Sequence, residues 1–324
     1  MEQETPLMNA PNSSIKTAAL LLGCVLVAVA AVLLLSPGDQ NHSPSVPGKG
    51  QNATGLNVSA LNSISIPISQ PAAIAVDSGG MIYVSGSESI VKLDASGKQL
   101  LEIPTSEPAG ALDIGPDQHI YAGIRNRVTV FDSRGTVQAE WMDIGEKARI
   151  TSVSVSSNRV AVADYGQHCI WLFDREGSLK KRITGTGKKG FVLPSACFDT
   201  VIESSGSILA ANPGRQRIER YSQAGRFITA WGKASVEPEG FCGCCNPVHI
   251  ALLPDGHVVT SEKGLRRVKI YSADGRFQRV LLDEKKLGRG PRAMDIAVDS
   301  QGKIYILEPV RKQIWNINRS DRSL

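Results

Sequence analysis

The sequence predicts an all-β fold, a six-bladed β-propeller with four-stranded blades, preceded by one N-terminal transmembrane helix. Three observations predict it. A unit of short apolar runs recurs six times after residue 56, its runs are separated by Gly, Asp and Asn turn residues, and an uncharged stretch of nineteen residues precedes all the repeats. Repetition of small four-stranded sheets at this period is typical of propellers.

Composition fits this class. Hydrophobic residues make up 42% of the 324 residues and charged residues 21%, which is ordinary for a protein with a buried core. Aromatic residues reach only 5% while glycine occurs 31 times, and this favours many short strands with tight turns. The formal net charge of +5 is mild and does not indicate a nucleic-acid partner.

The N-terminal part differs in character. Residues 17–35 contain no charge, and a helix of that length rises roughly 28 Å, enough to span a membrane. No small-residue cleavage site follows, so we expect an uncleaved signal-anchor after a tail at 1–16. Residues 36–55 are rich in Gly, Pro, Ser and Asn and predict a flexible linker to a propeller at 56–324.

These boundaries predict a single-pass membrane protein with its propeller outside the cytoplasm, in a periplasmic or extracellular space. The membrane is then one partner, through residues 17–35, and nucleic acid is not expected. The alternative is a lipoprotein processed at Cys24, which ends the run Leu21-Leu22-Gly23-Cys24.

The first two strands of each repeat form a hairpin pattern of alternating or β-branched runs. These hairpins are expected at 72–86, 111–123, 152–164, 200–212, 250–262 and 294–308. A third strand follows each, at 89–97, 127–135, 169–177, 217–225, 267–275 and 313–321, and then a Gly-turned fourth strand. The sixth repeat lacks an obvious fourth strand, and residues 56–66 could supply it and close the ring.

Further residues carry a resemblance to a known class. The segment around blade 4 contains Gly185-Thr186-Gly187, Gly190-Phe191, Pro194, Arg217-Ile218 and Tyr221. A polar residue also lies five residues before the third strand in four of the repeats, as Asp164, Asn212, Glu262 and Glu308. This pattern resembles the NHL-repeat propellers over residues 56–320, most clearly in blades three to six. The resemblance implies the six-bladed fold, but such propellers serve as protein-binding, RNA-binding and enzymatic scaffolds alike.

The most unusual motif is GFCGCCNP at 240–247. It places three extra residues between Phe241 and Pro247, compared with Phe191 and Pro194 one blade earlier, in a loop at the channel mouth. Three interpretations stay open for its thiols. They are a structural disulfide, a metal site with His249, and redox chemistry. The thiol candidates are Cys242, Cys244, Cys245, Cys169 and Cys197, and the metal candidates are Cys242, Cys244, Cys245 and His249.

Polar residues recur at the same loop face. The ligand-face candidates are Asn246, His249, Asp164, Asn212, Arg217, Glu262, Arg267 and Glu308. We prefer to interpret the acids and arginines as ion pairs that hold one blade against the next. The other interpretation is a polar ring that binds an anionic or sugar-like ligand at the channel mouth.

The function expected from these patterns is a non-enzymatic binding or scaffold module with a protein or small-molecule partner on its loop face. One alternative is a metal-dependent propeller enzyme resembling gluconolactonase-like hydrolases or peptide-amidating lyases. Another is a redox or metal-handling protein using the Cys242–Cys245 loop. No catalytic residue is assigned from the sequence, and no cofactor is expected, with a metal ion as the alternative.

Overall fold

A computed structural model describes residues 62–141, 144–288, 290 and 293–317. The tail, signal-anchor and linker expected at 1–16, 17–35 and 36–55 lie outside the described residues. None of the helices in the described ranges is long and apolar enough to cross a membrane. The chain divides into two units, residues 1–53 and 54–324, and the described residues all belong to the second.

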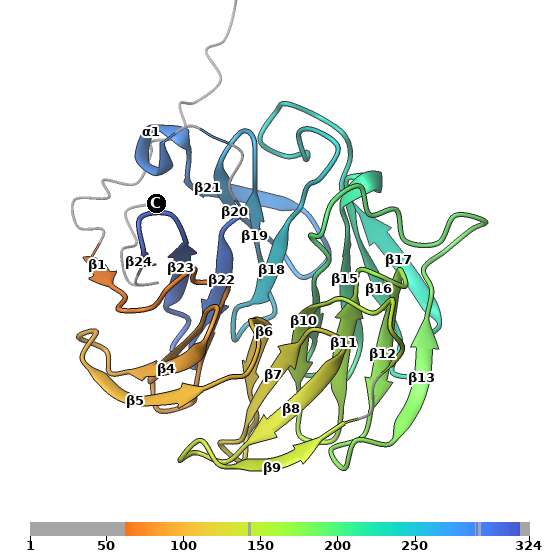
Figure 1. Ribbon diagram of the computed structural model, residues 1–324. Helices are drawn as coiled ribbons and strands as arrows, with labels where there is room; N and C mark the ends of the chain where they lie inside the picture. The colour runs from red at the N-terminus through yellow and green to blue at the C-terminus, as the bar shows by residue number, and fades with distance from the viewer. Residues whose placement is uncertain (1–61, 142–143, 289, 291–292, 318–324) are drawn as a thin grey trace, which may run out of the picture. The chain divides into compact units, whose positions relative to one another are not determined.

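Six antiparallel four-stranded sheets make up this unit, as the repeat predicts (Figure 1). From inner to outer strand, blade 1 is β2 (Ala73–Val76), β3 (Ile82–Ser85), β4 (Ser89–Leu93) and β5 (Gln99–Pro104). Blade 2 is β6 (Ala109–Ile114), β7 (Ile120–Ile124), β8 (Arg127–Phe131) and β9 (Val137–Glu140). Blade 3 is β10 (Ile150–Val155), β11 (Val160–Asp164), β12 (Cys169–Phe173) and β13 (Leu179–Ile183).

The other three blades repeat this order. Blade 4 is β14 (Thr200–Ile202), β15 (Ile208–Asn212), β16 (Arg217–Tyr221) and β17 (Phe227–Trp231), with the short 3-10 helix η1 (Pro213–Arg215) after β15. Blade 5 is β18 (His249–Leu252), β19 (Val258–Glu262), β20 (Arg267–Tyr271) and β21 (Phe277–Leu282), followed by α1 (Glu284–Leu287). Blade 6 is β22 (Asp295–Val298), β23 (Ile304–Glu308), β24 (Gln313–Ile317) and β1 (Asn62–Ser65).

The N-terminal strand closes the ring. β1 pairs antiparallel with β24, from Asn62 opposite Asn316 to Ser65 opposite Gln313, and so becomes the outer strand of blade 6. The expected closure by residues 56–66 is therefore confirmed for the described part of that segment. Contacts between successive inner strands run from β2 through β6, β10, β14 and β18 to β22 and back to β2. The ends of the domain are thus held in one sheet.

The core lies between the blades. The described residues contain six clusters of buried apolar side chains, and each cluster joins two neighbouring sheets. The cluster that joins blade 6 to blade 1, for example, contains Ile64, Val84 and Leu307. A sheet that is apolar on both faces cannot stay in water alone, so each blade depends on its two neighbours.

The recurring Asp-x-x-Gly turns between third and fourth strands follow from local hydrogen bonding. The Asp94 carboxylate accepts from the Ser96 and Lys98 amides at 2.8 and 3.0 Å, and Asp132 repeats this with Arg134 and Thr136. Gly97 has a φ of 91°, a conformation that side chains disfavour, and a Cβ there would lie 2.3 Å from Ile64 Cγ2. These turns fix the outer edges of blades 1 to 3, and Ser222 and Ser272 take the place of the aspartate in blades 4 and 5.

Candidate ligand site at the channel mouth

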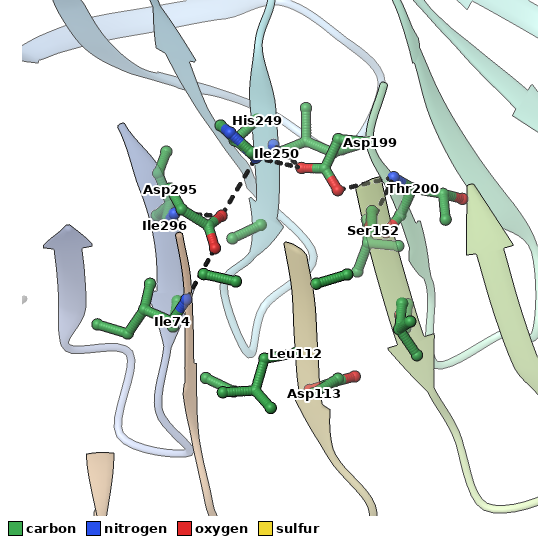
Figure 2. Close-up of a pocket in the computed structure, with 18 of the residues that line it drawn as sticks. Ile74, Leu112, Asp113, Ser152, Asp199, Thr200, His249, Ile250, Asp295 and Ile296 are labelled. Atoms are coloured by element: carbon green, nitrogen blue, oxygen red, sulfur yellow. Dashed lines mark hydrogen bonds and ion pairs between the residues drawn. The ribbon is translucent and has the colours of Figure 1, made fainter. Parts of the chain in front are cut away.

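The inner strands of all six blades line a central cavity of about 220 Å³. Figure 2 shows side chains from β14, β18 and β22 meeting at one end of it. This end is the mouth face, which we define as the face formed by the loop before each inner strand and the loop between each second and third strand. Both loops of blade 5, residues 232–248 and 263–266, therefore lie there.

Pairing with the second strands aligns the inner strands residue by residue. One equivalent position near the mouth end of each inner strand is occupied, in blade order, by Ala73, Ala111, Ser152, Asp199, His249 and Asp295. Their partners in the second strands are Ser85, Gly123, Ala163, Ala211, Ser261 and Leu307. Blades 3 to 6 thus contribute polar groups to this ring while blades 1 and 2 contribute alanine. The polar part of the ring, from blades 3 to 6, defines the candidate site.

Three of these side chains connect neighbouring blades. Asp199 Oδ2 accepts from the Ile250 amide at 2.7 Å, and Asp295 Oδ2 accepts from the Ile74 amide at 2.9 Å. Ser152 Oγ accepts from the Thr200 amide at 3.3 Å (Figure 2). The inner strand has no strand on its channel side, so its amides need such partners. Asp199 and Asp295 therefore have a structural role at the blade junctions.

His249 stands between the two carboxylates. Its Nδ1 lies 3.2 Å from Asp295 Oδ1 and 3.5 Å from Asp199 Oδ2, and its side chain is 17% exposed (Figure 2). Among the described residues, none forms a hydrogen bond with Nε2. The imidazole is thus oriented through Nδ1.

The charges set the protonation of this group. Burial opposes the protonation of His249, but the charges of Asp295 and Asp199 outweigh it and raise the pKa of the imidazole to about 9. Burial raises the pKa of Asp295, although the charge of His249 works against this. His249 is consequently an imidazolium at neutral pH, and Nε2 is a hydrogen-bond donor.

A third carboxylate lies two positions further along the inner strand of blade 2. Asp113 accepts from the Val155 amide at 2.7 Å and the Ile114 amide at 2.8 Å. In blade 3 the equivalent residue, Ser154, accepts from the Ile202 amide at 3.0 Å and so makes the same connection between blades. Burial raises the pKa of Asp113 to about 7. Figure 2 shows it well apart from the His249 group.

The cysteine loop is fastened beside the mouth by Asn246. The buried amide donates from Nδ2 to the Cys242 and Lys263 carbonyls, the latter at 2.7 Å, and accepts at Oδ1 from the Lys263 amide at 2.8 Å. Its hydrogen-bonding groups are therefore all used within the loop. Asn246, a ligand-face candidate from the sequence, positions the loop through these bonds.

Beneath the loop lies a buried charge cluster. Glu262 accepts from the Cys242 amide at 3.1 Å and pairs with Arg267 at 2.9 Å and Lys269 Nζ at 2.6 Å. Lys269 also donates to the Gly240 carbonyl at 2.6 Å, and burial lowers its pKa to about 8. Glu262 and Arg267 thus hold the base of the loop within one blade.

Other ligand-face candidates share this supporting role. Asp164 is fully buried and accepts from the Arg149 amide, and Asn212 accepts from the Val192 amide at 3.0 Å, both in the loop before their own blade. Arg217 pairs with Glu219 in blade 4, whereas Glu308 of blade 6 pairs with Arg266 of blade 5. The expected pairing between blades is therefore seen at Glu308, while Arg217 and Arg267 pair within a blade.

The five described cysteines are free thiols, so the expected disulfide is not seen among them. Cys169 is buried in β12, and burial raises the pKa of its thiol to about 11. Cys245 and Cys244 have their sulfurs 3.3 Å apart, and Lys263 Nζ lies 3.5 Å from Cys197 Sγ. Within the described ranges, no three His, Cys, Asp or Glu side chains are arranged to hold a metal ion. The Cys242, Cys244, Cys245 and His249 set is not assembled.

The sequence singled out His249 but missed Asp199, Asp295 and Asp113, and it missed Lys263 beside the thiols. A signal for two of them was present. Asp199 and Asp295 occupy the inner-strand position equivalent to His249, immediately before the apolar strand residues. Lys263 directly follows Glu262, so alignment of the repeats places it in the mouth loop of blade 5.

No family model matches the chain. Protein brain tumor of Drosophila melanogaster is 27% identical over 134 residues, which cover 40% of this chain and 12% of that protein, well under two thirds of its length. Among solved structures, streptogramin B lyase is similar at a TM-score of 0.55 with 13% identity, covering 79% of this chain and 96% of that one.

Two further structures are similar at comparable levels. Virginiamycin B lyase from Staphylococcus aureus, a catalytically inactive variant with quinupristin, has a TM-score of 0.57 and 12% identity, covering 77% of this chain and 80% of that one. The WD40 β-propeller domain of Doa1 has a TM-score of 0.55 and 15% identity, covering 78% and 80%. By fold, the described part of this chain is a β-propeller similar to these, and at such identities the likeness extends to the fold alone.

Proposed function

We propose that this propeller is a membrane-tethered, extracytoplasmic binding module of the NHL type whose ligand enters the channel mouth. The observation that carries the binding role is the His249 imidazole, which lines a cavity of about 220 Å³ and is held through Nδ1 beside two carboxylates. A rigid polar group at the end of an otherwise packed channel is the arrangement expected of a ligand site. The tether rests on the uncharged run at 17–35.

The chemistry of the mouth selects the ligand. An imidazolium Nε2 donates one hydrogen bond, so the group that enters must offer an acceptor, such as a carbonyl, carboxylate or hydroxyl oxygen. The cavity is large enough for a side chain or a chain end, not for a folded domain. We infer a protein partner that inserts one acceptor-bearing side chain or terminus, with the mouth loops contacting the surface around it.

The NHL assignment is supported by the GTG, GF and Pro motif of blade 4 and by the match to protein brain tumor, an NHL protein. The metal-dependent enzyme alternative gains no support from the donor arrangement. Asp199 and Asp295 already accept backbone hydrogen bonds between blades, and His249 Nδ1 faces them.

Site-specific photocrosslinking in cells that produce the full chain tests this proposal. Benzoylphenylalanine replaces Ala196, an exposed residue beside the mouth, or Phe227, an exposed residue on the outer strand β17, as the matched control. We expect a discrete crosslinked partner from position 196 that His249→Gln removes and His119→Gln leaves in place, because His119 lies in a hairpin turn. Equal capture from position 227, or capture that is insensitive to His249→Gln, would contradict the proposal.

A further inference from the structure

A second cluster on the mouth face contains three thiols around one ammonium group. Lys263 Nζ donates to Ser195 Oγ at 2.8 Å and lies 3.5 Å from Cys197 Sγ. Cys245 forms a hydrogen bond with Ser195, and its sulfur lies 3.3 Å from that of Cys244. The cluster joins residues from the loop before blade 4, the loop before blade 5 and the 263–266 loop of blade 5.

The cluster is held in place by contacts that do not involve its sulfurs. Asn246 binds both backbone groups of Lys263, and Gln216 Nε2 donates to the Gly243 carbonyl at 2.9 Å. Cys245 is half-buried, whereas Cys244 is exposed at the mouth. A reagent from solvent can therefore reach the Cys244–Cys245 pair, while the cation stays fixed behind it.

The electrostatics distinguish the two adjacent thiols. Burial opposes ionisation of Cys245, but hydrogen bonds from Ser195 and Cys244 and the charge of Lys263 lower the pKa of its thiol. The hydrogen bond and charge of Cys245 raise the pKa of Cys244. Cys245 is therefore the more acidic thiol of the pair, and Cys244 is the less acidic one.

We propose that Cys245 and Cys244 form a thiol–disulfide exchange site whose substrate is a disulfide that reaches the mouth face. The Cys245 thiolate attacks one sulfur of the substrate, the substrate S–S bond breaks, and one thiolate leaves and takes up a proton. Cys244 then loses its proton and attacks Cys245 Sγ, which releases the second thiol and closes the Cys244–Cys245 disulfide. The dithiol loses two electrons and the substrate disulfide gains them, so the step needs no other oxidant.

The adjacency of the two cysteines favours exchange over a permanent crosslink. Consecutive Cα atoms lie about 3.8 Å apart across a trans peptide, shorter than the usual Cα separation of about 4.4–6.8 Å in disulfides. A Cys244–Cys245 disulfide is therefore strained, and strained disulfides are the more oxidising and labile ones. The Lys263 ammonium group lies 3.5 Å from Cys197 Sγ, and a cation so close to the thiols favours a thiolate over a bound metal ion.

The aromatic disulfide dithiobis(nitrobenzoate) is the probe, used on the full chain in detergent, with the reacted cysteines identified by peptide mass mapping. We expect rapid release of two nitrothiophenolate ions per chain from this pair, the first on attack and the second on ring closure. Cys244→Ser should release one and retain a mixed disulfide on Cys245. Cys245→Ser should slow the fast phase by at least about ten-fold.

Two further variants test which groups are responsible for the fast phase. Cys242→Ser should leave the fast phase unchanged, and Lys263→Met should raise the pH midpoint of the reaction rate without changing the melting temperature appreciably. A fast phase that survives Cys245→Ser, or two ions released by Cys244→Ser, would overturn the proposal. Partner capture through His249 would be unaffected by either result, so this inference and the proposed binding function fail independently.

Discussion

At the scale of residues, the polar side chains at the equivalent inner-strand position do not all have the same role. Ser152, Asp199 and Asp295 satisfy amides of the next blade, which an inner strand cannot pair on its channel side. An imidazolium has no hydrogen-bond acceptor, so His249 cannot bind an amide of the next blade in this way. The Ile296 amide of blade 6 donates to Asp295 Oδ1 of its own blade, at 2.8 Å. His249 is thus the one polar residue at this ring position, among blades 3 to 6, that does not accept a hydrogen bond from the next blade, and this supports a role in binding.

Asp113 gives a prediction about pH and stability. Its pKa in the folded protein is about 7, above the ordinary value of 3.8, so the folded state keeps a proton that the unfolded state releases. The free energy of unfolding should therefore fall as pH rises from 4 to 7, through this group alone by about 1–3 kcal/mol. Well below the unfolded pKa of 3.8 both states are protonated, and the effect vanishes.

Asp113→Ser isolates that contribution. Serine already makes the same connection at Ser154, so the variant should keep the bond to the Val155 amide without a titrating group. Urea unfolding from pH 4 to pH 8 should show the stability of Asp113→Ser rising relative to wild type over this range. A difference between the two proteins that stays constant with pH would mean that Asp113 titrates normally.

His249 could be found from the sequence because histidine is rare here and follows an unusual cysteine motif. Its partners Asp199 and Asp295 were missed because each is a single acid before an apolar strand, and only alignment of the inner strands shows that both occupy the position equivalent to His249. Asp164, Asn212 and Glu262 were located because a polar residue recurs at this position of the repeat. What recurs in the structure is a hydrogen bond from a backbone amide of the loop before each blade.

At the scale of elements, β1 carries the closure of the ring. It alternates exposed and buried residues, and Ile64 and Ile66 pack into the cluster between blades 6 and 1. Closure joins segments about 250 positions apart in the sequence, so it depends on packing rather than on a turn. The sequence predicted this strand from the four-strand count alone, because blade 6 was one strand short.

Ile64→Ala should lower the free energy of unfolding by about 2–4 kcal/mol, since it leaves a cavity between Val84 and the residues of blade 6. Ser63→Ala, exposed on the same strand, is the matched control and should change stability by less than about 0.5 kcal/mol. Denaturant unfolding of both variants measures the difference. Equal and small effects would show that β1 does not contribute to the closed fold.

The cysteine loop shows where element-level prediction ends. The sequence predicts that this loop lies at the mouth. The contacts that hold the loop in place come from the side-chain amide of Asn246 and from the buried Glu262 and Lys269 beneath it. These contacts depend on side-chain geometry between two loops that are not adjacent in sequence. No spacing rule encodes them, which is why three interpretations of the thiols stayed open.

At the scale of the whole propeller, six sheets of similar sequence produce a ring whose chemistry is uneven. At the inner-strand position equivalent to His249, blades 1 and 2 have alanine, whereas blades 4, 5 and 6 have an acid, the histidine and an acid. The cysteine loop belongs to blade 5 as well. The charged and thiol-bearing side chains therefore concentrate on the part of the mouth face formed by blades 4 to 6, and this is where we propose that the ligand binds.

The charge state of His249 tests the central claim most directly. Nitrogen-15 NMR of histidine-labelled protein from pH 5 to pH 10 reads both ring nitrogens, and the signal is assigned by its loss in His249→Gln. We expect an imidazolium at neutral pH that titrates near pH 9, with a bound partner shifting Nε2 far more than Nδ1. A neutral ring at pH 7.5, or a partner that leaves Nε2 unmoved, would contradict the account.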